Sequence, residues 1–467
     1  MSPSGLPSLL AAIAGKSNLP GEHRLRKCLM DDQGRWLSYG DVIDRAHDIT
    51  RQIRQYTGGA VLLGVRNDIE SALAFLAAWA AELAVLMVDS SAHPVALDRM
   101  VSAFTPELLY KPDTGLVETR LVGPSVTPGT GILLSTSGTT GTTKFVRLHN
   151  AALFANATQI SEVLRIGPDD VGVCHLPLHY SYGLSVLLSH LQQRGAAFIT
   201  ECGVTSPELT TKLAAAGGTH FPGVPFHYTV LNRLGLDRMI PATVTTFTQA
   251  GGHLDVKIRK SIHEKALARG ARFYVMYGQT EAAPRIATLP SEDFPRKPDS
   301  VGKALPGGRL EIVDETGAVV PVGEIGQVVY RGPNVMLGYA TERSDLTRGD
   351  EMQGRLETGD LGRLDADGAL FIVGRHGRFA KVAGLRIGLE EVERRLRPEF
   401  EVALLPGSES VIVFHNSQHN AAGLLERLAA IAVEYCIPAR FFQLKQIDAI
   451  PYLTSGKIDY GHLRDIA

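Results

Sequence analysis

The chain has 467 residues, enough for at least two domains and a large buried core. Its hydrophobic fraction of 44% and its charged fraction of 21% are ordinary for a soluble globular protein. A formal net charge of −2 excludes bulk attraction to nucleic acid or to anionic membranes, so neither is an expected partner.

The N-terminus and the cysteines point to a cytoplasmic protein. The first five residues, MSPSG, lack the basic start and the apolar core of a signal peptide. The longest apolar run, residues 72–88, carries Glu82, and we interpret it as an Ala-rich helix followed by a strand and not as a membrane span. The 4 cysteines form no CxxC pair, which is typical of reduced thiols.

Strands and helices alternate through roughly the first 300 residues. A strand at 60–65, capping side chains at Asn67 and Asp68, an apolar helix and a strand ending at Asp89 form a βαβ unit, which requires a parallel sheet. The same pattern predicts further strands near 197–200, 243–248 and 273–277, and helices at about 256–269 and from about Ser206, with Pro207 in the first turn.

After Ser300 short strands and Gly-rich turns dominate, and Asp365 to Gly368 is a hairpin signal. From Gly374 the chain is predicted to be a small α+β unit with helices at 389–397 and 421–435. We therefore expect an α/β fold. A large layered N-terminal domain, 1–373, combines parallel-sheet subdomains with a small β-rich subdomain, and a small α+β domain, 374–467, follows.

The clearest chemical signal is STSGTTGTTK, residues 135–144, directly after an apolar strand at 131–134. A phosphate needs backbone N–H groups, hydroxyl donors and a cation, and this loop supplies all three. The alternative is a flexible linker, but linkers rarely follow a buried strand and end in lysine. The spacing is wrong for a Walker A loop, which excludes an ordinary P-loop NTPase.

This loop resembles the phosphate loop of the adenylate-forming superfamily, which includes acyl-CoA synthetases, aryl-acid ligases and adenylation domains. The family form usually has proline before the lysine, where this chain has Thr143. The resemblance implies ATP and Mg²⁺ as cofactors. It also implies that the phosphates are bound by Thr136, Ser137, Gly138, Thr139, Thr140, Gly141, Thr142 and Lys144.

A second motif, Tyr277-Gly278-Gln279-Thr280-Glu281, follows a predicted strand and resembles the family's aromatic-Gly-x-Thr-Glu sequence. There the glutamate helps to hold Mg²⁺ and the threonine contacts the α-phosphate. Metal and hydroxyl donors suit this task because the attacked phosphorus gains negative charge. Taken alone, the pentapeptide is also compatible with a plain strand-to-helix cap.

Two more motifs follow in the family's order. Asp360, in Thr-Gly-Asp, corresponds to the residue that receives both ribose hydroxyls, and Arg375 assists it; alone, the tripeptide is equally compatible with a surface turn. Lys457, in LTSGKI near the C-terminus, corresponds to the catalytic lysine that bridges the acid and the α-phosphate, although an isolated lysine there would be solvated surface.

Two segments concern the acid. In LPLHYSYGL, residues 176–184, Tyr180 corresponds to the aromatic gate, and Tyr182 and Phe226 suggest aromatic walls for an aryl or medium acyl chain. Ser181 replaces the aspartate of amino-acid-activating relatives. Pro177 makes a helical metal pair of His175 and His179 improbable. The loop AGGHL, with Gly252, is expected between adenine and the acyl group.

The segment from Gly374 resembles the family hinge and the start of its mobile C-terminal lid, with the hinge near Gly377. Lys381 and Gly384 would face the thiol site. About thirty family residues are missing after Glu401, which favours a carrier protein slightly over CoA. We expect an AMP-forming acid–thiol ligase that uses CoA or a carrier-protein phosphopantetheine. The alternatives are a catalytically silent nucleotide-binding or scaffolding protein, and a kinase that would release ADP.

Overall fold

The computed structural model describes residues 5–135, 144–375, 379–382, 385–408, 410–416, 420–434, 437–453 and 457–467. The side chains of six further residues lie outside this description: Arg375, Phe379, Lys381, Leu385, Arg386 and Glu434. The phosphate-loop residues Thr136 to Thr142, the hinge residue Gly377 and the thiol-site residue Gly384 therefore fall outside the described residues.

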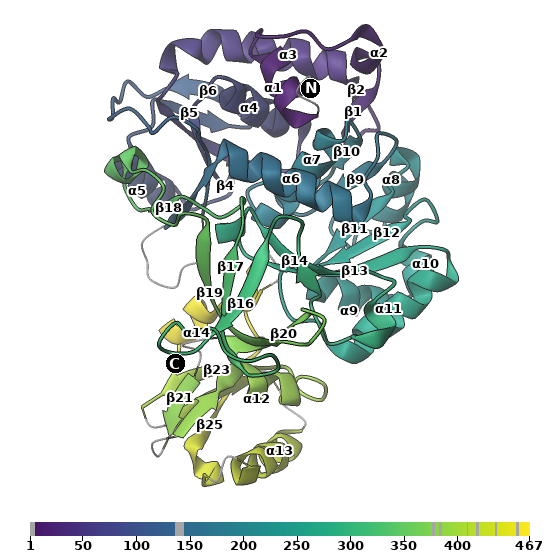
Figure 1. Cartoon of the computed structure of the whole chain (residues 1–467), viewed down its shortest axis with the longest axis vertical. Coiled ribbons are helices and arrows are strands. Elements are labelled where there is room, and N and C mark those ends of the chain that lie inside the picture. The colour runs from purple at the N-terminus through teal and green to yellow at the C-terminus, as the bar shows by residue number, and fades with distance from the viewer. Residues whose placement is uncertain are drawn as a thin grey trace.

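A seven-stranded sheet in the order β18-β8-β7-β4-β3-β5-β6 lies in the upper left part of the molecule in Figure 1. The predicted βαβ unit is present: β3 and β4 pair in parallel from Ala60↔Ala84 to Val65↔Asp89. The strands are β3 (Ala60–Val65), β4 (Ala84–Asp89), β5 (Leu108–Lys111), β6 (Gly115–Glu118), β7 (Thr130–Ser135), β8 (Phe145–His149) and β18 (Gly338–Ala340). The associated helices are α3 (Tyr39–Ile53), η1 (Arg54–Tyr56), α4 (Ile69–Ala80), α5 (Pro94–Phe104) and η4 (Arg343–Thr347).

Helix α4 explains the long apolar run. The Asp68 side chain caps its N-terminus by accepting from the backbone N–H of Ser71 at 2.7 Å. Almost every residue of α4 is buried, so it needs no polar face. The run is thus a core helix followed by β4, as predicted. Among the described residues, no helix is both long and apolar enough to cross a membrane.

A second sheet of nine strands follows the order β15-β14-β13-β12-β11-β9-β10-β1-β2. Its strands are β1 (Lys27–Met30), β2 (Trp36–Ser38), β9 (Val171–Cys174), β10 (Ala196–Ile199), β11 (His220–Gly223), β12 (Thr246–Gln249), β13 (Arg272–Gly278), β14 (Arg285–Leu289) and β15 (Lys303–Ala304). Its helical segments are α1 (Leu6–Ile13), α2 (Gly21–Arg24), α6 (Asn150–Leu164), α7 (Ser181–Gln192), α8 (Leu209–Ala216), α9 (Pro225–Leu234), α10 (Leu236–Met239), α11 (Val256–Ala268), η2 (Thr280–Ala282) and η3 (Phe294–Arg296).

The two sheets share one large hydrophobic core. This core joins Val61 and Leu63 of β3 to Ala197 of β10, with α4, α6 and α7 contributing apolar faces. Figure 1 shows α6 and α7 in the layer where the two sheets meet. The layered α/β prediction is therefore confirmed.

Two predicted boundaries differ from the structure. Helix α8 begins at Leu209 and not in the Ser206-Pro207 segment, because the backbone N–H of Leu209 first closes a turn onto the carbonyl of Ser206. Strand β12 begins at Thr246, because Val244 donates to the carbonyl of Pro241 in a preceding turn. Both errors occur where turns precede a regular element.

The β-rich part is an antiparallel four-stranded sheet in the order β16-β17-β19-β20. Its strands are β16 (Arg309–Val313), β17 (Gly326–Arg331), β19 (Arg355–Leu364) and β20 (Leu370–Arg375). The predicted Asp365–Gly368 turn joins β19 to β20, with Leu364 opposite Leu370.

The C-terminal part lies below this sheet in Figure 1. Its elements are β21 (Phe379–Val382), β22 (Leu385–Gly388), α12 (Leu389–Leu396), β23 (Val402–Gly407), β24 (Ser410–His415), α13 (Ala421–Glu434), η5 (Ala439–Phe441), β25 (Phe442–Gln446) and α14 (Tyr460–Asp465). Its two hydrophobic clusters contain only residues from Ala380 onward. A separate domain from residue 374 stays a prediction.

Candidate functional site

The second motif lies at the end of β13, the third strand from the β15 edge of the nine-stranded sheet. Gly278 closes that strand where the register with β14 shifts. A Cβ at Gly278 would stand 1.9 Å from the carbonyl oxygen of Pro284, so only glycine fits there. The chain then turns into η2, which carries Thr280 and Glu281.

Glu281 belongs to a small cluster assembled from three distant segments. The Tyr339 hydroxyl donates to Oε1 of Glu281 at 3.0 Å, and Nζ of Lys144 stands 3.3 Å over the ring of Tyr339. Burial and the adjacent Glu281 carboxylate raise the pKa of Tyr339 above its usual range, so the phenol stays a donor. The Tyr339 side chain therefore contacts both Glu281 and Lys144, the last residue of the predicted phosphate loop.

The chemistry of this cluster fits a magnesium nucleotide. Mg²⁺ is commonly held by one or two carboxylates together with phosphate oxygens, and Glu281 keeps a second oxygen besides the one that accepts from Tyr339. Among the described residues, no group of three or more His, Cys, Asp or Glu side chains forms a metal cage. The neighbouring Gln279 has a buried side-chain nitrogen without a hydrogen-bond partner in the described structure, which leaves a donor available.

The third motif meets the second across the site. The Tyr277 hydroxyl donates to Oδ2 of Asp360, and Asp360 is only 5% exposed on β19. The Asp360 backbone N–H donates to the Thr358 hydroxyl, which fixes the turn before it. The backbone of Arg375 on β20 lies directly opposite Asp360, so the sheet register brings the two predicted ribose residues together.

The acid-binding candidates surround Tyr180. The Nζ atom of Lys457 lies 5.9 Å from the centroid of the Tyr180 ring, although the two residues are far apart in sequence. Burial raises the pKa of Tyr180 to about 12. A Cβ at Gly251 would lie 2.7 Å from the Tyr180 hydroxyl, and the Gly252 carbonyl accepts from Gln249 at 2.9 Å. The glycine loop therefore packs directly against the predicted aromatic gate.

Tyr182 and Phe226 differ in their surroundings. Tyr182 is buried, and its hydroxyl donates to the carbonyl of Thr248 at 2.7 Å, so the ring is fixed below Tyr180. Phe226 is 50% exposed on the first turn of α9 with its ring against His227. The structure thus brings Tyr180 and Tyr182 together but leaves Phe226 outside this group, because the first turn of α9 faces solvent there.

Thr280 is held by Ser181 through a hydroxyl–hydroxyl contact of 3.1 Å. This contact links the start of α7, which carries Tyr180 and Tyr182, to the motif that carries Glu281. Sequence reasoning did not identify Tyr339, or Arg285, whose guanidinium lies over the ring of Tyr182. Neither stands in a motif with fixed spacing. Only the fold brings Tyr339 of β18 to Glu281 and pairs β14, which carries Arg285, with β13.

His175 and His179 lie beside different groups. His175 donates through Nε2 to the carbonyl of Pro222 at 2.7 Å, whereas Nε2 of His179 lies 3.9 Å from the Asp89 carboxylate. Burial lowers the pKa of His175 to about 4. The imidazole is therefore a neutral part of the core and donates one hydrogen bond.

This buried histidine predicts an acid sensitivity. The unfolded chain protonates His175 near its ordinary pKa of about 6.5, whereas the folded chain does so only near 4. The contribution of neutral His175 to folding stability is therefore fully present above the pKa of the unfolded state. It is lost as the pH falls toward the pKa of the folded state. Between about pH 7.5 and 5.5, His175 should lower the free energy of unfolding by about 1.3 kcal/mol. Urea denaturation at both pH values should show this difference reduced in His175→Gln; an unchanged pH dependence would contradict it.

Comparisons with known proteins agree with this arrangement. The fold is that of o-succinylbenzoate CoA synthetase from Bacillus subtilis, solved with the acyl-adenylate intermediate: the TM-score is 0.80 at 20% identity over 98% of both chains. The same Bacillus protein has been solved with ATP and magnesium ion. At this level of identity the likeness shows a shared fold.

The sequence comparisons add the family. Residues 130–340 match the AMP-binding enzyme family. A 4-coumarate–CoA ligase of Oryza sativa subsp. japonica is 25% identical over 95% of this chain and 92% of its own length. A 2-succinylbenzoate–CoA ligase of Bacillus cereus is 31% identical over 56% of this chain and 53% of its own length, so that match spans about half of the relative. The matched region contains Lys144 and the Tyr277–Glu281 motif, and it covers less than half of the chain.

Proposed function

We propose that this enzyme uses ATP and Mg²⁺ to convert a carboxylic acid to an acyl-adenylate and then transfers the acyl group to CoA. The observation that carries the proposal is the position of Lys457. A lysine from the C-terminal part lies over Tyr180, beside the glycine loop, and the Glu281 and Asp360 motifs converge on the same region. Relatives over nearly the whole chain and over about half of it are named CoA ligases.

In the first half-reaction, a carboxylate oxygen of the acid attacks the α-phosphorus of ATP and pyrophosphate leaves. Lys457 stabilises the charge on the acid and the α-phosphate, and Thr280 donates to the α-phosphate. Glu281 would hold the magnesium ion, and Lys144 with residues 136–142 of the loop would bind the departing phosphates. Asp360, assisted by Arg375, receives the ribose hydroxyls, while Tyr277, Gly278, Gln279 and Gly252 line the nucleotide.

In the second half-reaction, a thiol attacks the carbonyl carbon of the acyl-adenylate, AMP leaves and the thiol proton is lost to solvent. This step requires residues 374–467 to act as a lid that rotates near Gly377 and brings Lys381 and Gly384 to the thiol channel. The acceptor in this proposal is CoA, because the relatives are CoA ligases. A carrier-protein phosphopantetheine is the alternative that the compact lid suggested. The free thiols of Cys28, Cys174 and Cys202 agree with a cytoplasmic site of action.

Acid-dependent exchange of labelled pyrophosphate into ATP tests the first half-reaction. We expect exchange that requires both an acid and Mg²⁺, and AMP as the nucleotide product. ADP as product would indicate a kinase, and no exchange with any acid would indicate a silent nucleotide-binding protein. Thioester formation is then compared with CoA and with a phosphopantetheinylated carrier protein; transfer to the carrier protein alone would contradict CoA as the acceptor.

A further inference from the structure

Arg285 is a buried cation without a counter-ion among the described residues. It begins β14 and is only 3% exposed. No described carboxylate lies within salt-bridge distance of its guanidinium, whose Nε atom has no hydrogen-bond partner there. The guanidinium instead stacks on the ring of Tyr182, 3.9 Å from the centroid. A buried arginine stays charged, so its position is destabilising unless another group neutralises it or accepts its hydrogen bonds.

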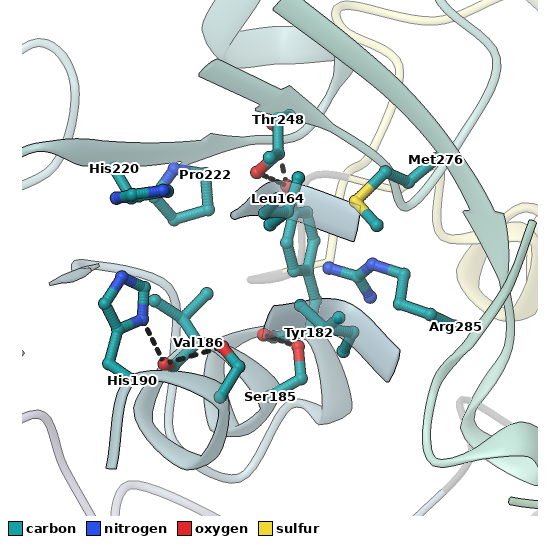
Figure 2. A pocket seen from close by; sticks show the side chains of 12 residues that line it. Leu164, Tyr182, Ser185, Val186, His190, His220, Pro222, Thr248, Met276 and Arg285 are labelled. Atoms are coloured by element: carbon teal, nitrogen blue, oxygen red, sulfur yellow. Dashed lines mark hydrogen bonds between the residues drawn. The ribbon is translucent and has the colours of Figure 1, made fainter. Parts of the chain in front are cut away.

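The arginine faces a small cavity of about 20 Å³, shown in Figure 2. His190 and His220 also line it, and the Nε2 atoms of both rings are buried without partners. Nδ1 of His190 donates to the Val186 carbonyl at 2.8 Å, so Nε2 of that neutral ring is an acceptor. The cavity thus has unused hydrogen-bonding capacity in its walls and room for only a few atoms.

Tyr182 lines this cavity and also contacts Tyr180 of the proposed acid site. The Tyr182 ring packs edge-to-face against Tyr180 with centroids 6.3 Å apart, and Lys457 stands over Tyr180. Contacts therefore run from Lys457 through the two tyrosines to Arg285. If the carboxylate of an acid binds Lys457, the rest of the acid would lie along the rings of Tyr180 and Tyr182 and be directed toward the cavity.

We propose that Arg285 binds an oxygen acceptor at the far end of the acid, so that the substrate carries a hydroxyl, carbonyl or second carboxylate remote from the group being activated. This inference rests on the proposed acid activation. An apolar acid would bury the guanidinium still further without giving it an acceptor. A site built to hydrogen-bond a substituent rejects analogues that lack it far more strongly than an apolar pocket rejects a missing methylene.

The test uses matched acids in the pyrophosphate exchange assay: benzoate with its hydroxy and carboxy derivatives, and hexanoate with its ω-hydroxy and ω-carboxy counterparts. We expect kcat/KM to be about 10⁴-fold higher for an oxygen-bearing acid than for its parent in at least one set. The hydroxy and carboxy arms distinguish a neutral acceptor from an anion. Exchange that proceeds equally well with the unsubstituted parents would overturn this inference and leave the proposed function standing. No exchange with any acid would contradict both.

Variants separate binding from a structural role. Arg285→Met should remove most of the preference for the oxygen-bearing acid, should spare or improve the parent acid, and should not lower the Tm. Arg147→Met is the matched control, because Arg147 is equally buried but is paired with Glu351. It should lower the Tm and leave the ratio between acids unchanged. If Arg285→Met does not fold, Arg285→Lys replaces it; an unaltered acid preference in the folded variant would contradict the proposal.

Discussion

Replacing Lys457 by alanine is expected to slow acyl-adenylate formation by about 100-fold or more, the usual effect of removing a donor that stabilises charge in the transition state. Thioester formation from supplied acyl-adenylate should change far less. The reason is positional: Nζ of Lys457 lies beside Tyr180 in the arrangement described here. In the thioester step the lid is proposed to turn this lysine away from the reacting carbonyl.

Two assays measure this separation. Acid-dependent pyrophosphate exchange reports adenylation, and mixing the enzyme with synthetic acyl-adenylate and CoA reports the thioester step. Lys445→Ala is a matched control: Lys445 also lies over an aromatic ring, 6.0 Å from the centroid of Phe414, but its Nζ donates to the carbonyl of Ile466 within the C-terminal part. It should leave both rates unchanged. If Lys457→Ala spares both half-reactions or abolishes both, the lid does not take one position for adenylation and another for thioester formation.

The sequence predicted the local secondary structure around two of the continuous motifs. The strand before Tyr277 and the hairpin after Asp360 could be predicted because alternating apolar residues and turn residues in the local sequence indicate them. The β19–β20 register then brings the backbones of Asp360 and Arg375 opposite each other. Element boundaries were less accurate where a turn precedes the element, as before α8 and β12.

Contacts between distant segments could not be predicted. Tyr339 reaches Glu281 only because β18 joins the edge of the seven-stranded sheet beside β8, and a strand of three residues has almost no sequence signal. Arg285 would be expected at the surface, since arginine is rarely fully buried. Phe226 was assigned to the acid pocket from its aromatic character, but composition does not tell which face of a helix turns to solvent.

Replacing Asp360 by alanine is expected to raise the KM for ATP by about 100-fold, since each hydrogen bond to a charged group contributes about 1.5–3 kcal/mol. The carboxylate is 5% exposed and accepts from the Tyr277 hydroxyl, which orients it for the ribose. Tyr277→Phe keeps the carboxylate but frees its rotation, so a smaller loss of about 10-fold is expected.

The decisive comparison uses ATP analogues that lack one ribose hydroxyl. The wild-type enzyme should bind ATP more tightly than each analogue by calorimetry, whereas Asp360→Ala should bind all of them equally, because the group that distinguishes them is gone. Asp365→Ala is the control from the same hairpin: Asp365 pairs with Lys297 instead, so its loss should affect stability and leave the KM for ATP unchanged. If Asp360→Ala still discriminates between ATP and the analogues, another residue reads the ribose, and the Tyr277–Asp360 contact serves only to fasten β13 to the four-stranded sheet.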